Sequence, residues 1–160
     1  SAEVHSVTVY SPAPTEVDVY LAEQIDGDVL VQANKTVGVS AAAVTDVYNA
    51  LVADDVRPLT DLVRVNSATA KAYRIDAVVY VKNGISPQLI LSQGMTALRQ
   101  YLTDNFKPNA RVATSRIIGA LDVMGVSRIE LTEPKNDVMT AIGEVAHCTG
   151  YNIIAKSEGT

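Results

Sequence analysis

Residues 71–88 read KAYRIDAVVYVKNGISPQ and place a strand, a turn and the start of a helix in immediate succession. Every second residue between Lys71 and Val81 is apolar, which is typical of a β-strand that buries one face. The opposite face is polar at Arg74 and Asp76 and apolar further on. We therefore expect that face to be exposed at one end of the strand and covered at the other.

The same stretch continues into a helix. Asn83-Gly84 is a turn dipeptide, and Ser86 followed by Pro87 combines an N-cap residue with proline at the first helical position. This pattern predicts a helix that runs to about Asn105. Its apolar stripe consists of Leu91, Met95, Leu98 and Leu102, with Tyr101 alongside.

Further elements are predicted downstream of this helix. A shorter helix is expected from about Thr114, with Gly125 in the position of a left-handed C-cap. Its apolar residues at helical spacing are Ile117, Ile118, Leu121 and Met124. Strands are predicted over Val126–Thr132 and Tyr151–Ala155, with a further segment over Val138–Ala146 between them.

The amino-terminal half shows a similar alternation of strands and helix. Val4–Tyr10 and Glu16–Glu23 both alternate between apolar and polar residues and predict strands, and a short strand is expected over Val29–Val31. Ser40 is a good N-cap for a helix to about Ala53. A strand from Leu62 follows and closes at Asn66-Ser67.

The order of these elements predicts an α+β fold with a mixed sheet and helices packed on one face. Two interpretations of its organisation stay open. The chain forms a single domain over residues 1–160, or it contains two similar β-α-β units at about 1–68 and 69–155.

The composition limits the kinds of partner that we expect the chain to bind. The chain has 160 residues, of which 48% are hydrophobic and 19% charged, as in soluble globular proteins. The net charge is −5 and no two basic residues are adjacent, so we do not expect a nucleic-acid partner. No run of eighteen apolar residues occurs, so no membrane contact is expected either.

No chemical site is predicted. His147 precedes Cys148, but two ligands do not complete a metal site, and a small buried thiol is the better interpretation of this lone cysteine. Asp26 and Asp28 flank Gly27 without the later ligands of a calcium loop, which favours a polar turn. We therefore expect no catalytic residue, no cofactor and no bound metal.

One motif and its surroundings resemble a known family. The motif is the run Arg57, Pro58, Leu59, Thr60 and Asp61, which leads into the strand from Leu62. Further similar segments lie before the motif, at residues 7–20, and after it, at residues 73–77, 113–126 and 145–151. Together they resemble the carboxy-terminal part of the baseplate J-like protein family of contractile-tailed phages.

This resemblance implies a structural role and no enzymatic activity. Such proteins are wedge components of the baseplate at the tip of a contractile tail, assembled in the bacterial cytoplasm and carried in the virion. The implied partners are other baseplate proteins and copies of the chain itself, with no small-molecule substrate. Arg57 and Asp61 are expected to fix the corner between helix and strand, and Lys71–Val81 and Tyr151–Ala155 are candidate contact edges.

Two other functions stay open from the residues alone. A small-molecule binding domain would need a concave pocket with a few convergent polar groups. A hydrolase or transferase with a dispersed site would need a pocket lined by ionisable residues whose pKa values are shifted.

Overall fold

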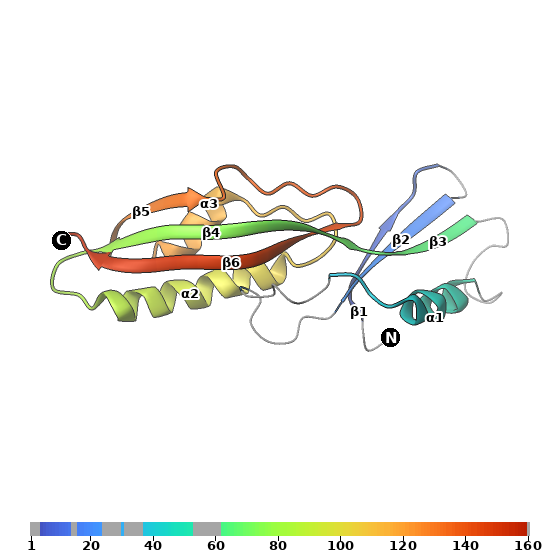
Figure 1. Ribbon diagram of the computed structural model, residues 1–160, viewed down its shortest axis with the longest axis horizontal. Helices are drawn as coiled ribbons and strands as arrows, with labels where there is room; N and C mark the ends of the chain where they lie inside the picture. Colours follow the sequence, from blue (N-terminus) through green and yellow to red (C-terminus); the bar gives the residue numbers. More distant parts are fainter. Residues whose placement is uncertain (1–3, 14–15, 24–29, 31–36, 53–61, 160) are drawn as a thin grey trace.

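The computed structural model describes residues 4–13, 16–23, 30, 37–52 and 62–159. In these residues, six strands form two three-stranded sheets, and three helices accompany them (Figure 1). Each sheet contains both a parallel and an antiparallel pair of strands. The predicted α+β fold is confirmed, and two mixed sheets take the place of the one mixed sheet that was expected.

The amino-terminal half forms what we name the first sheet. Its elements are β1 (Val4–Tyr10), β2 (Glu16–Glu23), β3 (Leu62–Ser67) and the helix α1 (Ala41–Leu51). β2 lies in the centre, antiparallel to β1 and parallel to β3. Ser40 caps α1 as predicted, because its side chain accepts a hydrogen bond from the backbone N–H of Ala43. Leu30 lies in a turn, so the short strand predicted around it is wrong there.

The carboxy-terminal half forms the second sheet. Its elements are β4 (Thr69–Val81), β5 (Val126–Glu133), β6 (Glu144–Ser157) and the helices α2 (Pro87–Asp104) and α3 (Thr114–Leu121). β4 lies in the centre, antiparallel to β5 and parallel to β6. α2 begins at Pro87 behind the N-cap Ser86, as the sequence predicts.

β4 shows the predicted alternation. Ile75, Ala77, Val79 and Val81 are buried. On the opposite face Arg74 is exposed, whereas Asp76, Val78 and Tyr80 are half-buried. The expected change from exposed to covered side chains along that face is therefore present but small.

The end of α3 differs from the prediction. The helix ends at Leu121 with Asp122 as its C-cap, so Gly125 is not the helix cap. Gly125 instead adopts a positive φ of 103° in the turn that leads into β5. Met124 lies beyond the helix and is 93% exposed, and Ile118 is also exposed. The helical spacing of these residues was a poor guide to burial because the helix is only two turns long.

β6 also differs from the prediction, because a single strand replaces the two predicted segments. It extends from Glu144 to Ser157 and pairs with β4 throughout. The register shifts where Cys148 and Gly150 face consecutive residues of β4, which leaves Thr149 as an extra residue. This bulge interrupts the alternation of apolar and polar residues from which the strands were predicted.

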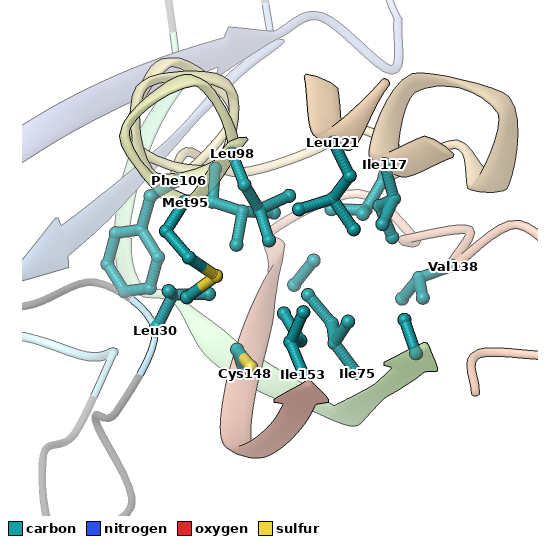
Figure 2. Packing of buried hydrophobic residues seen from close by; sticks show 14 of the residues in the cluster. Leu30, Ile75, Met95, Leu98, Phe106, Ile117, Leu121, Val138, Cys148 and Ile153 are labelled. Carbon is teal, nitrogen blue, oxygen red and sulfur yellow. The ribbon is translucent and has the colours of Figure 1, made fainter. Parts of the chain in front are cut away.

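The main hydrophobic core lies between the second sheet, α2 and α3, and Ala22, Leu30 and Val37 of the amino-terminal half also belong to it. Side chains of α2 and α3 pack against one face of β4 and β6, so helices on one face are confirmed for this sheet (Figure 2). Its largest fully buried members include Ile75, Leu98, Ile117 and Leu121. A separate, smaller cluster lies between α1 and the first sheet and consists of Val19, Leu21, Val39 and Ala43.

The two sheets are joined by one continuous stretch of chain. Ala68 alone separates β3 from β4, and its backbone N–H donates to the carbonyl of Leu21 at 2.7 Å. The ring of Tyr20 lies directly against Gly143, where a Cβ atom would come within 2.4 Å of the ring. Only glycine fits this close approach, so Gly143 allows the first sheet to lie against the second.

Candidate functional site

The sequence motif at residues 57–61 lies outside the described residues. Arg57, Pro58, Leu59, Thr60 and Asp61 immediately precede Leu62, the first residue of β3. Their expected role at the corner between helix and strand stays a prediction.

His147 and Cys148 are both buried, although neighbours in a strand usually point to opposite faces. Cys148 belongs to the main core, as expected of a small buried thiol, and its Sγ donates to the carbonyl of Gly150 at 3.3 Å. The ring of His147 meets that of Phe106 edge-on, with centroids 6.3 Å apart. Among the described residues, no group of three or more His, Cys, Asp or Glu could hold a metal ion.

Tyr73 is a half-buried side chain that packs against the main core, and the pKa of its phenol is shifted. It lies in β4 opposite Cys148 of β6. Its burial raises the pKa of the phenol well above the ordinary value, because the charged form would lose its hydration. This side chain is therefore neutral in the folded protein at any physiological pH.

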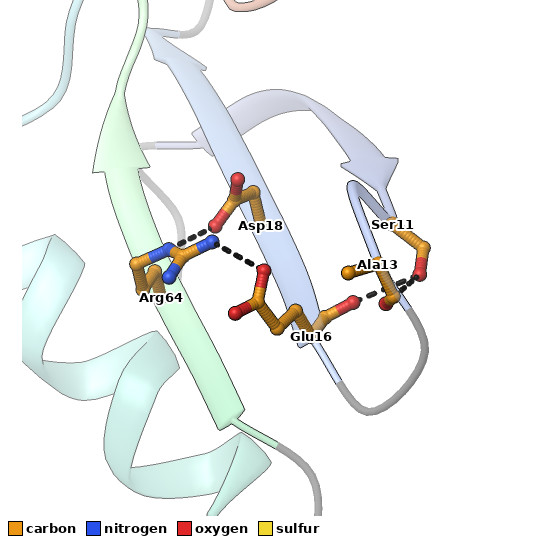
Figure 3. Close-up of polar contacts among 5 residues, drawn as sticks. All are labelled: Ser11, Ala13, Glu16, Asp18 and Arg64. Atoms are coloured by element: carbon orange, nitrogen blue, oxygen red, sulfur yellow. Dashed lines mark hydrogen bonds and ion pairs between the residues drawn. The ribbon is translucent and has the colours of Figure 1, made fainter.

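One face of the first sheet carries an ion-pair cluster (Figure 3). Arg64 of β3 donates to the carboxylate of Asp18 on β2 and also lies 3.5 Å from that of Glu16. The hydrogen bond to Asp18 raises the pKa of the Arg64 guanidinium. Asp18 is only 9% exposed, and its carboxylate accepts this hydrogen bond. No local sequence pattern predicts this pair, because its members are 46 residues apart.

The open face of the second sheet carries a second, more exposed charge cluster. The guanidinium of Arg128 lies 3.9 Å from the ring centroid of Tyr80 and 2.6 Å from the carboxylate of Glu130. The hydrogen bond from Arg128 lowers the pKa of Glu130. Both side chains of this ion pair are more than half exposed, which is typical of a solvated surface.

The amino terminus of α3 is capped by a residue that is distant in the sequence. Ala113 in the N-cap position offers no side-chain hydrogen bond, but the backbone N–H and the hydroxyl of Thr114 both donate to Asp137. The bond from the Thr114 backbone lowers the pKa of Asp137. This cap fastens the segment before β6 to the helix, and sequence reasoning missed it because the two residues are 23 positions apart.

Three grooves mark the surface of the described residues. The first has a volume of about 420 Å³ and is lined by residues of α1 and β3: Val44, Thr45, Tyr48, Val63, Arg64, Val65 and Asn66. The second, of about 390 Å³, lies between α2 and β6 and includes Arg99 and Tyr151. The third, of about 420 Å³, includes Tyr101, Arg111 and Arg116.

These grooves differ from the pocket expected of a small-molecule site. Their buried lining residues are Val63, Met95 and Ile153, which are all apolar. Their charged lining residues are arginines, and none of these is buried. No lining residue therefore supplies the buried, convergent polar group that usually fixes a small ligand.

Large exposed apolar side chains occur in both halves of the described chain, and several of them lie at the two edges of the first sheet. Val7, Val9 and Tyr10 of β1 are exposed, as are Leu62 of β3 and Tyr48 of α1. Of the two predicted contact edges, Tyr151–Ala155 lies within the outer strand β6, where Ile154 is 40% exposed. Lys71–Val81 lies within the central strand β4, which pairs with β6 along this length and with β5 from Asp76, so the prediction of an edge there is wrong. The sequence did not single out β1 or β3 as edges, because edge position depends on strand order.

None of the helices in the described part of the chain is long and apolar enough to cross a membrane.

Comparison with known proteins gives two matches. Residues 73–154 match the family described as the baseplate J-like protein C-terminal domain. Baseplate protein J of Escherichia phage P2 is 32% identical over 151 residues, which are 94% of this chain and 47% of the relative. The chain therefore spans about half the length of this curated relative.

Proposed function

Since the chain belongs to the baseplate J-like protein family, we propose that it is a structural component of a contractile phage-type tail baseplate, without catalytic activity of its own. The observation that carries this proposal is the place of the family match. Residues 73–154 contain nearly all of β4 to β6 together with α2 and α3, which build the main core. The family model therefore covers the part of the chain that builds most of the main core.

The proposed role is to hold a fixed shape against neighbouring proteins. Its partners are other wedge proteins of the baseplate and further copies of the chain. The distribution of side chains supports this role, because large apolar residues are exposed at the edges of the first sheet. The proposed location is the baseplate of the virion, after assembly in the bacterial cytoplasm.

The experiment is a deletion of the coding segment in the phage or prophage that carries it. We expect deletion to abolish complete contractile tails in electron micrographs, and expression of the wild-type chain in trans to restore them. Complementation with a chain carrying Lys82→Arg serves as a matched control, because this side chain is exposed and the change keeps its charge. Tails of normal number and shape without the segment would contradict the proposal.

A further inference from the structure

The first sheet has two open edges in the described part of the chain. β1 pairs only with β2, and β3 also pairs only with β2. The exposed fractions of the apolar side chains on these edges are 54% for Val7, 63% for Val9, 41% for Tyr10 and 50% for Leu62. On the central strand, by contrast, Val19 and Leu21 are buried. The apolar surface that this sheet leaves exposed therefore lies on its two edge strands, β1 and β3.

The β1 edge lacks the usual protection against pairing. Natural edge strands carry charged residues, proline or bulges that prevent another strand from adding. Val4–Tyr10 contains no Lys, Arg, Asp, Glu or Pro. Its one irregularity lies between Val4 and Ser6, so the register is regular from Ser6 to Tyr10. A further strand can pair with this regular part.

The β3 edge carries a matching groove. The groove of about 420 Å³ lies beside β3 and is lined by Val44 and Tyr48 of α1 and by Val65 of β3. Val19 pairs with both Val9 and Val65, so these three residues lie on one face of the sheet. α1 covers this face at β2 and β3 but leaves Val7 and Val9 exposed. The groove beside β3 thus has room for apolar side chains such as those that are exposed on β1.

The strand directions allow the two edges to meet. β1 is antiparallel to β2, and β3 is parallel to β2. If a second copy continues the sheet in the same orientation, its β1 lies antiparallel to β3 of the first copy. Its Val7 and Val9 then lie on the face covered by α1, because continuation of the sheet preserves the faces.

One register places each apolar residue of this part of β1 opposite an apolar residue of β3. It places Tyr10 opposite Leu62, Val9 opposite Val63 and Val7 opposite Val65. The polar pairs in this register are Thr8 with Arg64 and Ser6 with Asn66. No like charges meet, because β1 brings no Lys, Arg, Asp or Glu, and the charge of Arg64 is already paired with Asp18. A shift by one residue would put the valines on the wrong face.

We propose that β1 of one copy adds to the β3 edge of the next copy, antiparallel and in this register, so that the first sheets of neighbouring copies join. The contact is head-to-tail, and contacts of this kind close into rings or extend into open chains. This inference rests on the proposed function in one respect, because it names the surface through which copies of the chain assemble.

The experiment is disulfide cross-linking with a matched pair of variants. The chain carrying Tyr10→Cys and Leu62→Cys is expected to form covalent dimers and larger species on mild oxidation, because directly opposite side chains lie at disulfide distance. Within one chain these positions flank β2 on opposite sides, about two strand spacings of 4.8 Å apart, too far for a disulfide. Every disulfide between them therefore joins two copies.

The control carries Val9→Cys and Leu62→Cys. It has the same number of cysteines at exposed positions, but the two side chains point to opposite faces in the proposed register. We expect its cross-linking to be about tenfold lower, since a one-residue slip reverses the faces. Adding Val9→Lys to the Tyr10→Cys and Leu62→Cys chain should also suppress cross-linking, whereas adding Met124→Lys should not.

Both variants are tested as purified chains and in assembled tails. Equal cross-linking of the matched pair in both settings would overturn the proposed contact, as would full cross-linking in the presence of Val9→Lys. If tails contain the chain in the baseplate but show no excess cross-linking, the contact is wrong and the proposed function stands. If tails assemble normally without the chain, the proposed function fails whatever the purified chain does.

Discussion

The two sheets of this protein share a plan but differ in how they bury their apolar residues. Each has a central strand with one antiparallel and one parallel neighbour. The second sheet and its two helices enclose a core that includes Ile75, Leu98, Ile117 and Leu121, all at most 1% exposed. The first sheet and α1 enclose a much smaller cluster and leave valines uncovered on β1.

This difference suggests a division of labour within the chain. A large closed core supplies stability, since burial of apolar surface is the dominant favourable contribution to folding. A small core with uncovered edges supplies surfaces for neighbours. We propose that the chain contains two units, at about 1–68 and 69–155, with the second as the scaffold and the first as the part that meets other copies.

The largest effect should come from removing equivalent leucines from the two cores. Leu98 and Leu21 are both 0% exposed, so Leu98→Ala and Leu21→Ala delete the same atoms from full burial. We expect Leu98→Ala to lower the free energy of unfolding by about 3–5 kcal/mol, and Leu21→Ala by about 2–3 kcal/mol, because a small cluster collapses more easily around a cavity. Urea denaturation followed by circular dichroism measures both. A larger loss for Leu21→Ala would contradict the proposed division.

A smaller effect should separate the ion pairs of the two sheets. Arg64→Ala leaves the carboxylate of Asp18, which is 9% exposed, without its cation. We expect this variant to lower the free energy of unfolding more than its control does, because a nearly buried carboxylate loses its charge-assisted hydrogen bond. Its matched control is Arg74→Ala in the second sheet, where the pair with Asp76 is exposed and is expected to contribute less than about 1 kcal/mol. Equal losses in the same urea experiment would show that the first sheet does not depend on its charge cluster.

The smallest change in the free energy of unfolding at neutral pH should come from replacing Tyr73 in the second sheet. This change is expected to grow as the pH rises. Its folded pKa is raised by burial, so the unfolded chain loses this proton first, at about pH 10. The stability from the neutral phenol is therefore complete below pH 10 and falls above it by about 1.4 kcal/mol per pH unit. Tyr73→Phe should make the alkaline decline less steep and leave stability near pH 7 almost unchanged. Identical alkaline slopes would show that this phenol is not the group that couples pH to the second core.

Local signals in the sequence predicted much of the fold. Alternation gave the bounds of β1 and β2, and the caps Ser40 and Ser86 gave the starts of α1 and α2. Two predictions failed because they depended on an unbroken pattern. The bulge at Thr149 hid the continuity of β6, and the early end of α3 left Met124 exposed.

The candidate surfaces were harder to predict because they depend on contacts between distant residues. Whether β1 is an edge depends on which strands pair, and this is not encoded in its own seven residues. The Arg64–Asp18 pair and the Asp137 cap likewise join residues far apart in the chain. The family resemblance, by contrast, could be recognised from short segments in a fixed order, and comparison with known proteins confirmed it.

The most direct test of the central claim is an electron cryomicroscopy map of an assembled tail that carries this chain. The account predicts density for the chain in the baseplate, with the second sheet as a compact body and β1 of one copy beside β3 of the next. A map in which the baseplate lacks the chain would contradict the structural role. A map in which both edges of the first sheet face solvent would contradict the proposed contact.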